Sequence, residues 1–173
     1  MNKFIIKIEE ENLKSLELQD IECFSLSSTL SKSFITEFKQ KASDKIVLIH
    51  GDNAQELCQE LDIDGIILDL SKEEKIKPLI KQAKSSNPQK IIGVISRSRR
   101  HEAMIISEEE PDFIIFNIYK DGIDNLKELT SWYNEFFLIQ SAAEIKDEDI
   151  LLDDITADIF ILSYNQYKKN LPK

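Results

Sequence analysis

Short apolar runs recur along the chain, and this recurrence limits the possible folds more than any other feature. Most of the runs are rich in Ile, Val or Phe and are continuous rather than alternating, which is typical of strands buried on both faces of a parallel sheet. Helical patterns lie between most of them, so the sequence predicts an α/β fold. The eight runs are Lys3–Ile8, Ile21–Leu26, Lys45–Ile49, Gly65–Leu70, Lys90–Ile95, Asp112–Ile118, Phe136–Ile139 and Asp158–Leu162.

An internal repeat supports this count of strands. Every second run begins at or just after an aspartate, and the four aspartates are separated by 44, 48 and 46 residues. A period of this length, covering two strands and two helices, indicates four βαβα modules and therefore eight β/α units. Eight such units predict a closed (β/α)8 TIM barrel. The four aspartates are Asp20, Asp64, Asp112 and Asp158.

The length of the chain bears on this prediction. With 173 residues, of which 42% are hydrophobic, the chain is long enough for one domain with a sizeable core. We expect a single barrel domain over residues 1–173. Because barrels of this type usually need about 200 residues or more, its outer helices should be short or missing. The alternative fold is an open doubly wound parallel sheet.

Composition excludes several classes of function. The net charge of −10 makes the chain a poor candidate for binding nucleic acid or anionic membranes. No apolar run approaches the roughly 20 residues that span a bilayer, so we expect a cytoplasmic protein. The two cysteines, Cys23 and Cys58, lie far apart without CxxC spacing, which argues against a zinc site.

A basic stretch interrupts this acidic chain. Arg97, Ser98, Arg99 and Arg100 follow a predicted strand and begin a predicted helix. Positive charge is disfavoured by the dipole at a helix N-terminus, so another group should compensate it. A bound phosphate would do so, since helix N-termini and arginines both favour anions. Neighbouring carboxylates are the alternative.

Several segments resemble thiamine-phosphate synthases and their TenI-like relatives. Residues 48–70 are similar to the third strand, helix and fourth strand of that family, and residues 90–117 to its next unit. The segment from Arg97 to Met104 and the pair Trp132-Tyr133 are similar to a divergent alphaproteobacterial branch. The resemblance implies a (β/α)8 barrel that joins a pyrimidine methyl diphosphate to a thiazole phosphate and releases pyrophosphate, with Mg²⁺.

The resemblance also implies a metal site. Asp52 and Asn53 stand where the family has an Asn-Asp pair after its third strand, and Asp69 follows the fourth strand. Carboxylate oxygens at strand ends suit Mg²⁺, so these three residues are the expected ligands. Helix N-capping is the alternative role for Asp52 and Asn53.

The phosphate sites of the family are altered in this chain. Lys120 could replace a pyrophosphate-binding lysine, but the Pro-Thr loop around it is absent. Ser141 stands in a Gln-Ser-Ala-Ala segment where the family binds phosphate with a Gly-Gly pair. Two hypotheses follow: a thiamine-phosphate-synthase-like transferase, or a non-catalytic relative that binds a phosphorylated small molecule or regulates. A homodimer is possible in either case.

Overall fold

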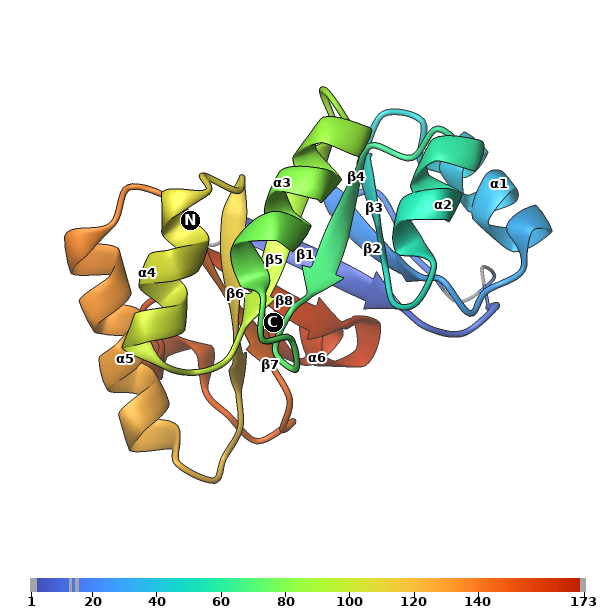
Figure 1. Ribbon diagram of the computed structural model, residues 1–173. Helices are drawn as coiled ribbons and strands as arrows, with labels where there is room; N and C mark the ends of the chain where they lie inside the picture. The colour runs from blue at the N-terminus through green and yellow to red at the C-terminus, as the bar shows by residue number, and fades with distance from the viewer. Residues whose placement is uncertain (1–2, 13, 15, 172–173) are drawn as a thin grey trace.

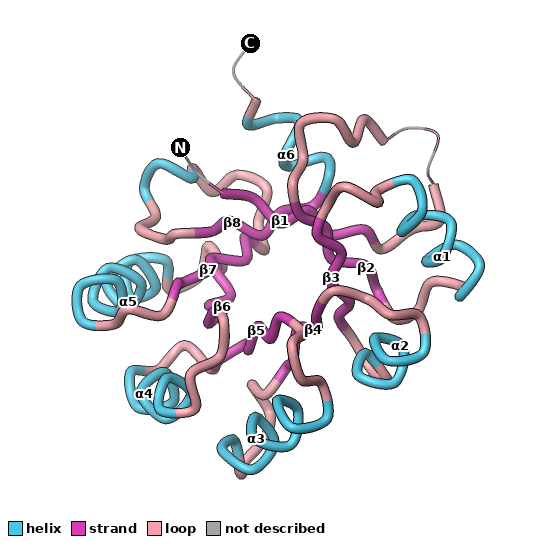
Figure 2. The backbone as a smooth tube through the Cα atoms, turned by 90° about the horizontal axis from the view of Figure 1, so that it is seen from above, coloured by secondary structure: helices cyan, strands magenta, loops and turns pink. Residues whose placement is uncertain are grey.

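The strands form a closed barrel in a computed structural model that describes residues 3–12, 14 and 16–171. Each strand pairs in parallel with the next, and β1 pairs with β8, with Lys3 opposite Ile159 and Lys7 opposite Ser163. Figure 2 looks down this ring of strands. The strands are β1 (Lys3–Ile8), β2 (Cys23–Ser27), β3 (Ile46–His50), β4 (Gly65–Asp69), β5 (Ile91–Ser96), β6 (Phe113–Ile118), β7 (Gln140–Ile145) and β8 (Ile159–Ser163).

The helices lie outside the ring of strands (Figures 1 and 2). No helix is assigned to the described residues between β1 and β2, and only a 3₁₀ turn, Leu152–Asp154, lies between β7 and β8. The predicted barrel with short or missing outer helices is therefore confirmed, and its closure excludes the open sheet. The helices are α1 (Lys32–Lys41), α2 (Ala54–Glu60), α3 (Ile76–Ser86), α4 (Arg100–Glu108), α5 (Ile123–Phe136) and α6 (Tyr164–Asn170).

Local sequence explains where the helices begin. At α1, the Ser31 side chain accepts a hydrogen bond from the Phe34 amide, which satisfies one of the free N–H groups of the first turn. At α6, Ser163 and Gln166 form a reciprocal capping box. Because Ser163 is also the last residue of β8, this box fixes the start of α6 at the C-terminal edge of the barrel.

The repeated aspartates have a structural role. The side chains of Asp64, Asp112 and Asp158 each accept a backbone N–H from the second residue of the preceding strand. The amide of each aspartate in turn donates to the carbonyl of that same residue. The regular spacing of the aspartates thus reflects one type of contact between neighbouring strands at the N-terminal end of the barrel. This contact recurs at β3–β4, β5–β6 and β7–β8.

Apolar side chains form two separate clusters. The larger cluster joins the outward faces of the strands to the helices and includes Phe24, Phe38, Phe116 and Tyr133. The smaller cluster contains residues from strands only and fills the inside of the barrel. Its buried members are Ile5, Leu48, Ile67, Phe113, Ile115, Ala142, Ile159 and Ile161.

The seventh strand differs from its prediction. The run Phe136–Ile139 was expected to be this strand, but α5 continues to Phe136 and β7 begins at Gln140. The prediction was wrong because a short apolar run at the end of a helix has the same pattern as a short strand. These aromatic residues instead pack against α5, where the Tyr133 and Phe137 rings stack with centroids 4.6 Å apart. The strand itself, Gln-Ser-Ala-Ala-Glu-Ile, carries few large apolar residues.

Candidate functional site

A polar layer lies at the C-terminal end of the barrel interior. Side chains alternate between the two faces of a strand, so residues two positions beyond the interior apolar cluster also face inward. At this level the inward positions change from apolar to polar on most strands. These positions hold Lys7, Ser25, His50, Asp69, Asn117, Glu144 and Ser163.

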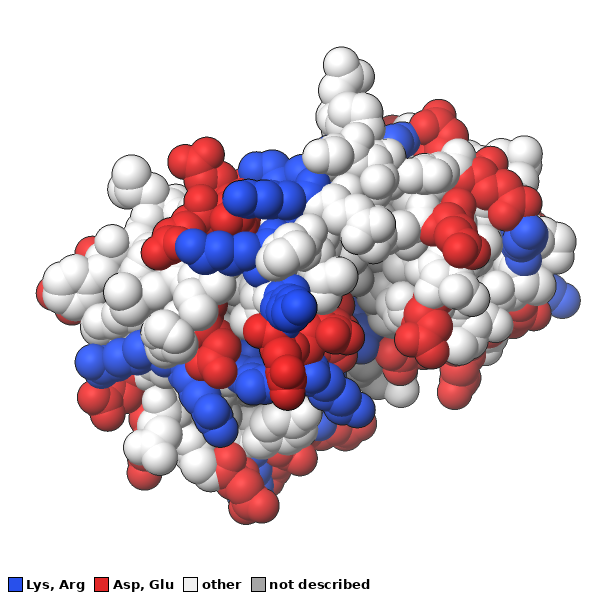
Figure 3. All heavy atoms as spheres, viewed as in Figure 1, with Lys and Arg blue, Asp and Glu red and all other residues white. Residues whose placement is uncertain are grey.

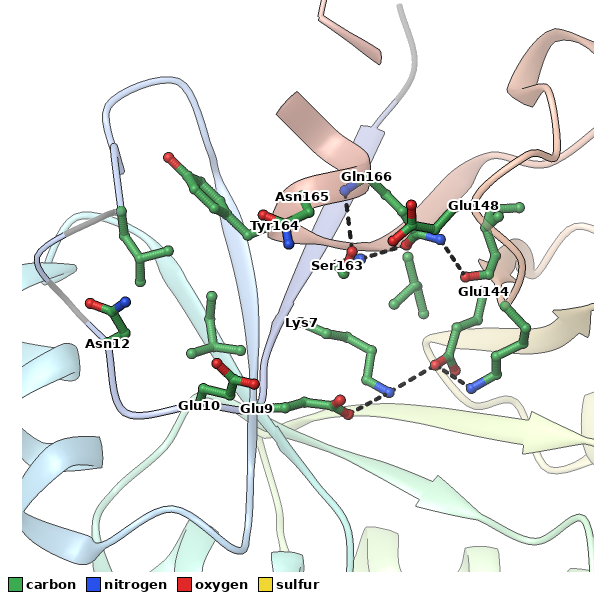
Figure 4. A pocket seen from close by; sticks show the side chains of 15 residues that line it. Lys7, Glu9, Glu10, Asn12, Glu144, Glu148, Ser163, Tyr164, Asn165 and Gln166 are labelled. Carbon is green, nitrogen blue, oxygen red and sulfur yellow. Dashed lines mark hydrogen bonds and ion pairs between the residues drawn. The ribbon is translucent and has the colours of Figure 1, made fainter. Parts of the chain in front are cut away.

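Glu144 is the most buried charge in this layer. Its side chain is 6% exposed, and its Oε1 accepts hydrogen bonds from Lys7 Nζ at 2.8 Å and Lys146 Nζ at 2.5 Å. Lys7 comes from β1 and Glu144 from β7, so the ion pair spans β8 (Figure 4). A buried charge needs such partners, because an uncompensated one would cost several kcal/mol.

The same network continues across the mouth to β2. Lys7 Nζ lies 3.0 Å from Glu9 Oε1, and that oxygen lies 3.4 Å from His50 Nε2. On its other side, His50 Nδ1 shares a hydrogen bond of 2.7 Å with the Ser25 hydroxyl. His50 Nε2 and Asn117 Oδ1 are buried and have no hydrogen-bond partner among the described residues.

The charge states of the network follow from this arrangement. Burial and the Lys7 charge lower the pKa of His50 to about 4, so the imidazole is neutral at pH 7. Burial opposes the charges of Lys7 and Glu144, but their mutual attraction outweighs it. The pKa of Lys7 is therefore raised and that of Glu144 is lowered, with Lys146 adding to the effect on Glu144. Lys7 is thus an ammonium and not an amine nucleophile.

A pocket of about 630 Å³ opens beside this network. Lys7, Glu9 and Glu144 form one side of it, and Glu10 and Asn12 from the loop after β1 form another. The first residues of α6, Tyr164 to Gln166, complete the wall (Figure 4). Its volume falls within the range of about 300–1,000 Å³ that is usual for small-molecule sites. Its position at the C-terminal strand ends is where barrel enzymes place their active sites.

Ser25 contacts His50, and His50 in turn contacts Glu9. These are the residue types of the nucleophile, base and acid of a catalytic triad. Ser25 is fully buried inside the barrel, so no substrate carbonyl could reach its hydroxyl. The hydroxyl instead satisfies His50 Nδ1, which fixes the orientation of the ring. The geometry therefore does not support a serine hydrolase.

The basic stretch is compensated by protein groups. Arg97 lies in the loop between β5 and α4, and its Nε donates to the Ser71 carbonyl. Arg97 and Arg99 both approach Glu102, at 3.8 and 3.9 Å. Neighbouring carboxylates and carbonyls, the alternative considered from the sequence, thus balance much of this charge.

Arg100 is engaged on the outside of the barrel. Its guanidinium lies 3.2 Å from Glu128 of α5 and 4.9 Å from the centroid of the Trp132 ring. Ser98 and Arg100 line a second, shallower groove between α4 and α5. In Figure 3 acidic and basic side chains are interleaved on the face shown, and no broad basic surface is seen there.

The other two expected phosphate ligands lie far from each other in the barrel. Lys120 follows β6 at the C-terminal end, where it pairs with Asp149. Ser141 is the second residue of β7 and lies at the opposite, N-terminal end, so the expectation that it follows this strand was wrong. Because β7 begins four residues later than expected, Ser141 lies near its start. There the Ser141 amide donates to the Asp158 side chain and the Ser141 hydroxyl donates to the Asn134 side chain.

The expected magnesium ligands are not gathered into a metal site. Asn53 begins α2 in a left-handed conformation without a side-chain capping bond, and Asp52 is exposed in the turn before it. Asp69 accepts from the amide and hydroxyl of Ser71. Within the described residues, no three His, Cys, Asp or Glu side chains are placed to hold a metal ion.

Solved structures share this fold. A thiamine phosphate pyrophosphorylase from Pyrococcus furiosus matches with a TM-score of 0.65 and 14% identity, over 93% of this chain and 85% of that one. A variant of the citrate synthase SbnG matches with a TM-score of 0.62 and 12% identity, over 97% and 88%. No family model and no curated protein matches the sequence. This chain is a (β/α)8 barrel of the kind seen in both proteins.

One structural observation bears on the expectation about membranes. Among the residues that the structure describes, no helix combines the length and the apolar character needed to cross a bilayer.

Proposed function

We propose that this chain binds a polar small molecule in the pocket at the barrel mouth, and that it is a non-catalytic or chemically altered relative of the thiamine-phosphate-synthase barrels. The observation that supports this proposal most strongly is the network of Lys7, Glu144 and Lys146 at the pocket wall. Replacing a buried ion pair by apolar residues often costs nothing or even stabilises a protein. A buried charge network at the end of the barrel where barrel enzymes place their active sites therefore favours a role in ligand binding.

The reaction of the resembling family receives less support from the residues. Arg97, Arg99, Arg100 and Lys120 already contact carboxylates or carbonyls. An entering diphosphate would have to replace these contacts. Ser141 lies at the other end of the barrel.

The second candidate is a thiamine-phosphate-synthase-like transferase. The fold shared with the Pyrococcus furiosus protein and the position of Asp69 at the end of β4 favour it. In that case Asp52, Asn53 and Asp69 would have to rearrange to hold Mg²⁺, and Arg97 and Lys120 would exchange their present partners for phosphate.

One experiment separates the two candidates. We expect neither magnesium pyrophosphate nor thiamine phosphate to raise the unfolding temperature, and the two phosphorylated substrates with Mg²⁺ to give no product above an enzyme-free control. A ligand at 100 times its dissociation constant would add about 2.7 kcal/mol of stability, which thermal unfolding detects easily. Product formation that is lost in Asp69→Ala but kept in Asp44→Ala would instead establish the transferase.

A further inference from the structure

The two oxygens of the Glu144 carboxylate are used unequally. Both lysines that contact this side chain, Lys7 and Lys146, donate to Oε1. Among the described residues no group donates to Oε2, although the Glu144 side chain is only 6% exposed. Oε2 is not one of the fully enclosed atoms that lack a partner, and Glu144 lines the mouth pocket (Figure 4). The pocket is therefore the space from which a donor can reach this oxygen.

The neighbouring donors in the pocket are also only partly used. An ammonium group carries three N–H donors, and Lys146 directs one of them to Glu144. The Lys146 side chain is 29% exposed and lines the same pocket. Ser163, at the end of β8, accepts from the Gln166 amide, and its own hydroxyl proton has no acceptor within the part of the chain that the structure describes. The pocket wall thus presents both an acceptor and donors to a ligand.

The charges around the free oxygen cancel. Two ammonium groups and two carboxylates form one connected network, which consists of Lys7, Lys146, Glu9 and Glu144. Of the other carboxylates that line the pocket, Glu148 is paired with Lys169, and Glu10 is exposed so that water screens its charge. A cationic group at Oε2 would be repelled by the two ammonium groups, and an anionic group by the carboxylate itself. The network therefore favours a ligand without charge.

We infer that the mouth pocket binds a neutral polyhydroxylated molecule, of the sugar or polyol class, whose neighbouring hydroxyls donate to Glu144 Oε2 and accept from Lys146 Nζ. This inference rests on the proposed function and names its ligand class. A hydroxyl group has one donor and two acceptor positions, so it satisfies a carboxylate and an ammonium group together without changing the balance of charge. Hydrogen bonds to charged groups are roughly twice as strong as those between neutral groups.

Four neutral polyols and their charged derivatives test the inference. The polyols are glucose, ribose, myo-inositol and glycerol, and each is compared with its phosphate monoester and with an amino derivative. With uniformly ¹⁵N-labelled protein and millimolar probe, we expect at least one polyol to shift the amide resonances of residues 7–10, 144–146 and 163–166. That polyol should bind about threefold or more tightly than either of its charged derivatives. Cyclohexanol, which lacks neighbouring hydroxyls, should cause no shift.

Two lysine variants locate the hydrogen bonds. Lys146→Met removes a donor from the pocket and should weaken binding of the best polyol about tenfold, the loss expected for one hydrogen bond to a charged group. The matched control is Lys127→Met on α5, because Lys127 has a similar exposed fraction of 33% and also contacts a carboxylate, that of Asp154. It should leave binding unchanged, and the amide spectra show whether both variants are folded.

Several results would overturn the inference while leaving a ligand site at the mouth. They are tighter binding of a phosphate monoester or an amino derivative, equal shifts caused by cyclohexanol, and unchanged polyol binding in Lys146→Met. If none of the four polyols shifts these resonances, the polyol site is wrong. If a metabolite library at millimolar concentration also shifts none of them, the proposed function is wrong as well.

Discussion

Replacing His50 by glutamine should remove much of the acid sensitivity of this protein between pH 6.5 and pH 4.5. His50 is neutral in the folded state with a pKa of about 4, against an ordinary value of 6.5. Its folded pKa is depressed, so the unfolded chain binds the proton first as the pH falls. The stabilising contribution is therefore complete above pH 6.5 and is lost progressively toward pH 4.

The expected size follows from the shift in pKa. Each pKa unit corresponds to about 1.4 kcal/mol, so wild type should lose about 2 to 3 kcal/mol more than His50→Gln between pH 7 and pH 4.5. Urea unfolding at both pH values measures this difference. The control is His101→Gln, because His101 is the exposed histidine on α4 and should leave the pH dependence of wild type unchanged. Parallel pH profiles for wild type and His50→Gln would show that His50 is not held neutral in the barrel.

Removing the charge of Glu144 should have the largest effect on stability. Glu144→Gln leaves the Lys7 ammonium, which is 21% exposed, without its closest acceptor inside the barrel. Breaking a buried pair from one side typically costs about 3–5 kcal/mol. We expect a loss of this size in the free energy of unfolding, measured by urea denaturation at pH 7.

Two further variants separate charge from packing at this site. The double variant Lys7→Met with Glu144→Leu removes both charges of this pair and should recover most of the lost stability, because neither is then left buried without the other. Lys146, which also contacts Glu144, is more exposed than Lys7 and can turn to solvent. On the surface, Glu108→Gln breaks the exposed pair with Lys77 and should leave stability unchanged. A Glu144→Gln protein as stable as wild type would mean that Glu9 or water, and not Glu144, compensates Lys7.

Much of the fold could be predicted because it is encoded by local patterns. Continuous Ile- and Val-rich runs mark strands that are covered on both faces, and repeated aspartates mark the pairing at the N-terminal end. The error at β7 arose because Ala142 and Ala143 give little apolar signal, whereas Phe136 and Phe137 at the end of α5 give a strong one.

The candidate site was largely missed because sequence reasoning looked beyond the strand ends. Lys7, His50 and Glu144 each lie at one of the last two positions of their strands. Lys7 falls inside the apolar run Lys3–Ile8, whereas His50 and Glu144 lie beyond the runs Lys45–Ile49 and Phe136–Ile139. They share one feature: each is a polar residue at a position whose side chain points into the barrel. Such a pattern can be found in a sequence only when the inward face of each strand is known, and closure of the barrel supplies that information.

The basic stretch posed a different problem. Arg97 to Arg100 stood out because they are close in sequence, yet their partners, Glu102, Glu128 and the Ser71 carbonyl, come from three different segments. Charge compensation of this kind depends on tertiary contacts. The sequence alone therefore leaves both a bound phosphate and a neighbouring carboxylate open as the group that compensates the arginines.

Filling one of two grooves with tryptophan tests most directly whether the mouth pocket is the ligand site. Asn165 is an exposed residue in the wall of the mouth pocket, and Asn125 is an exposed residue in the groove beside Ser98 and Arg100. A metabolite library should first be screened by thermal unfolding of the wild-type protein, and the best ligand then titrated against both variants. We expect Asn165→Trp to abolish the ligand-induced rise in unfolding temperature and Asn125→Trp to keep it. Loss of the rise in Asn125→Trp, with full retention in Asn165→Trp, would contradict the account and move the site to the basic stretch.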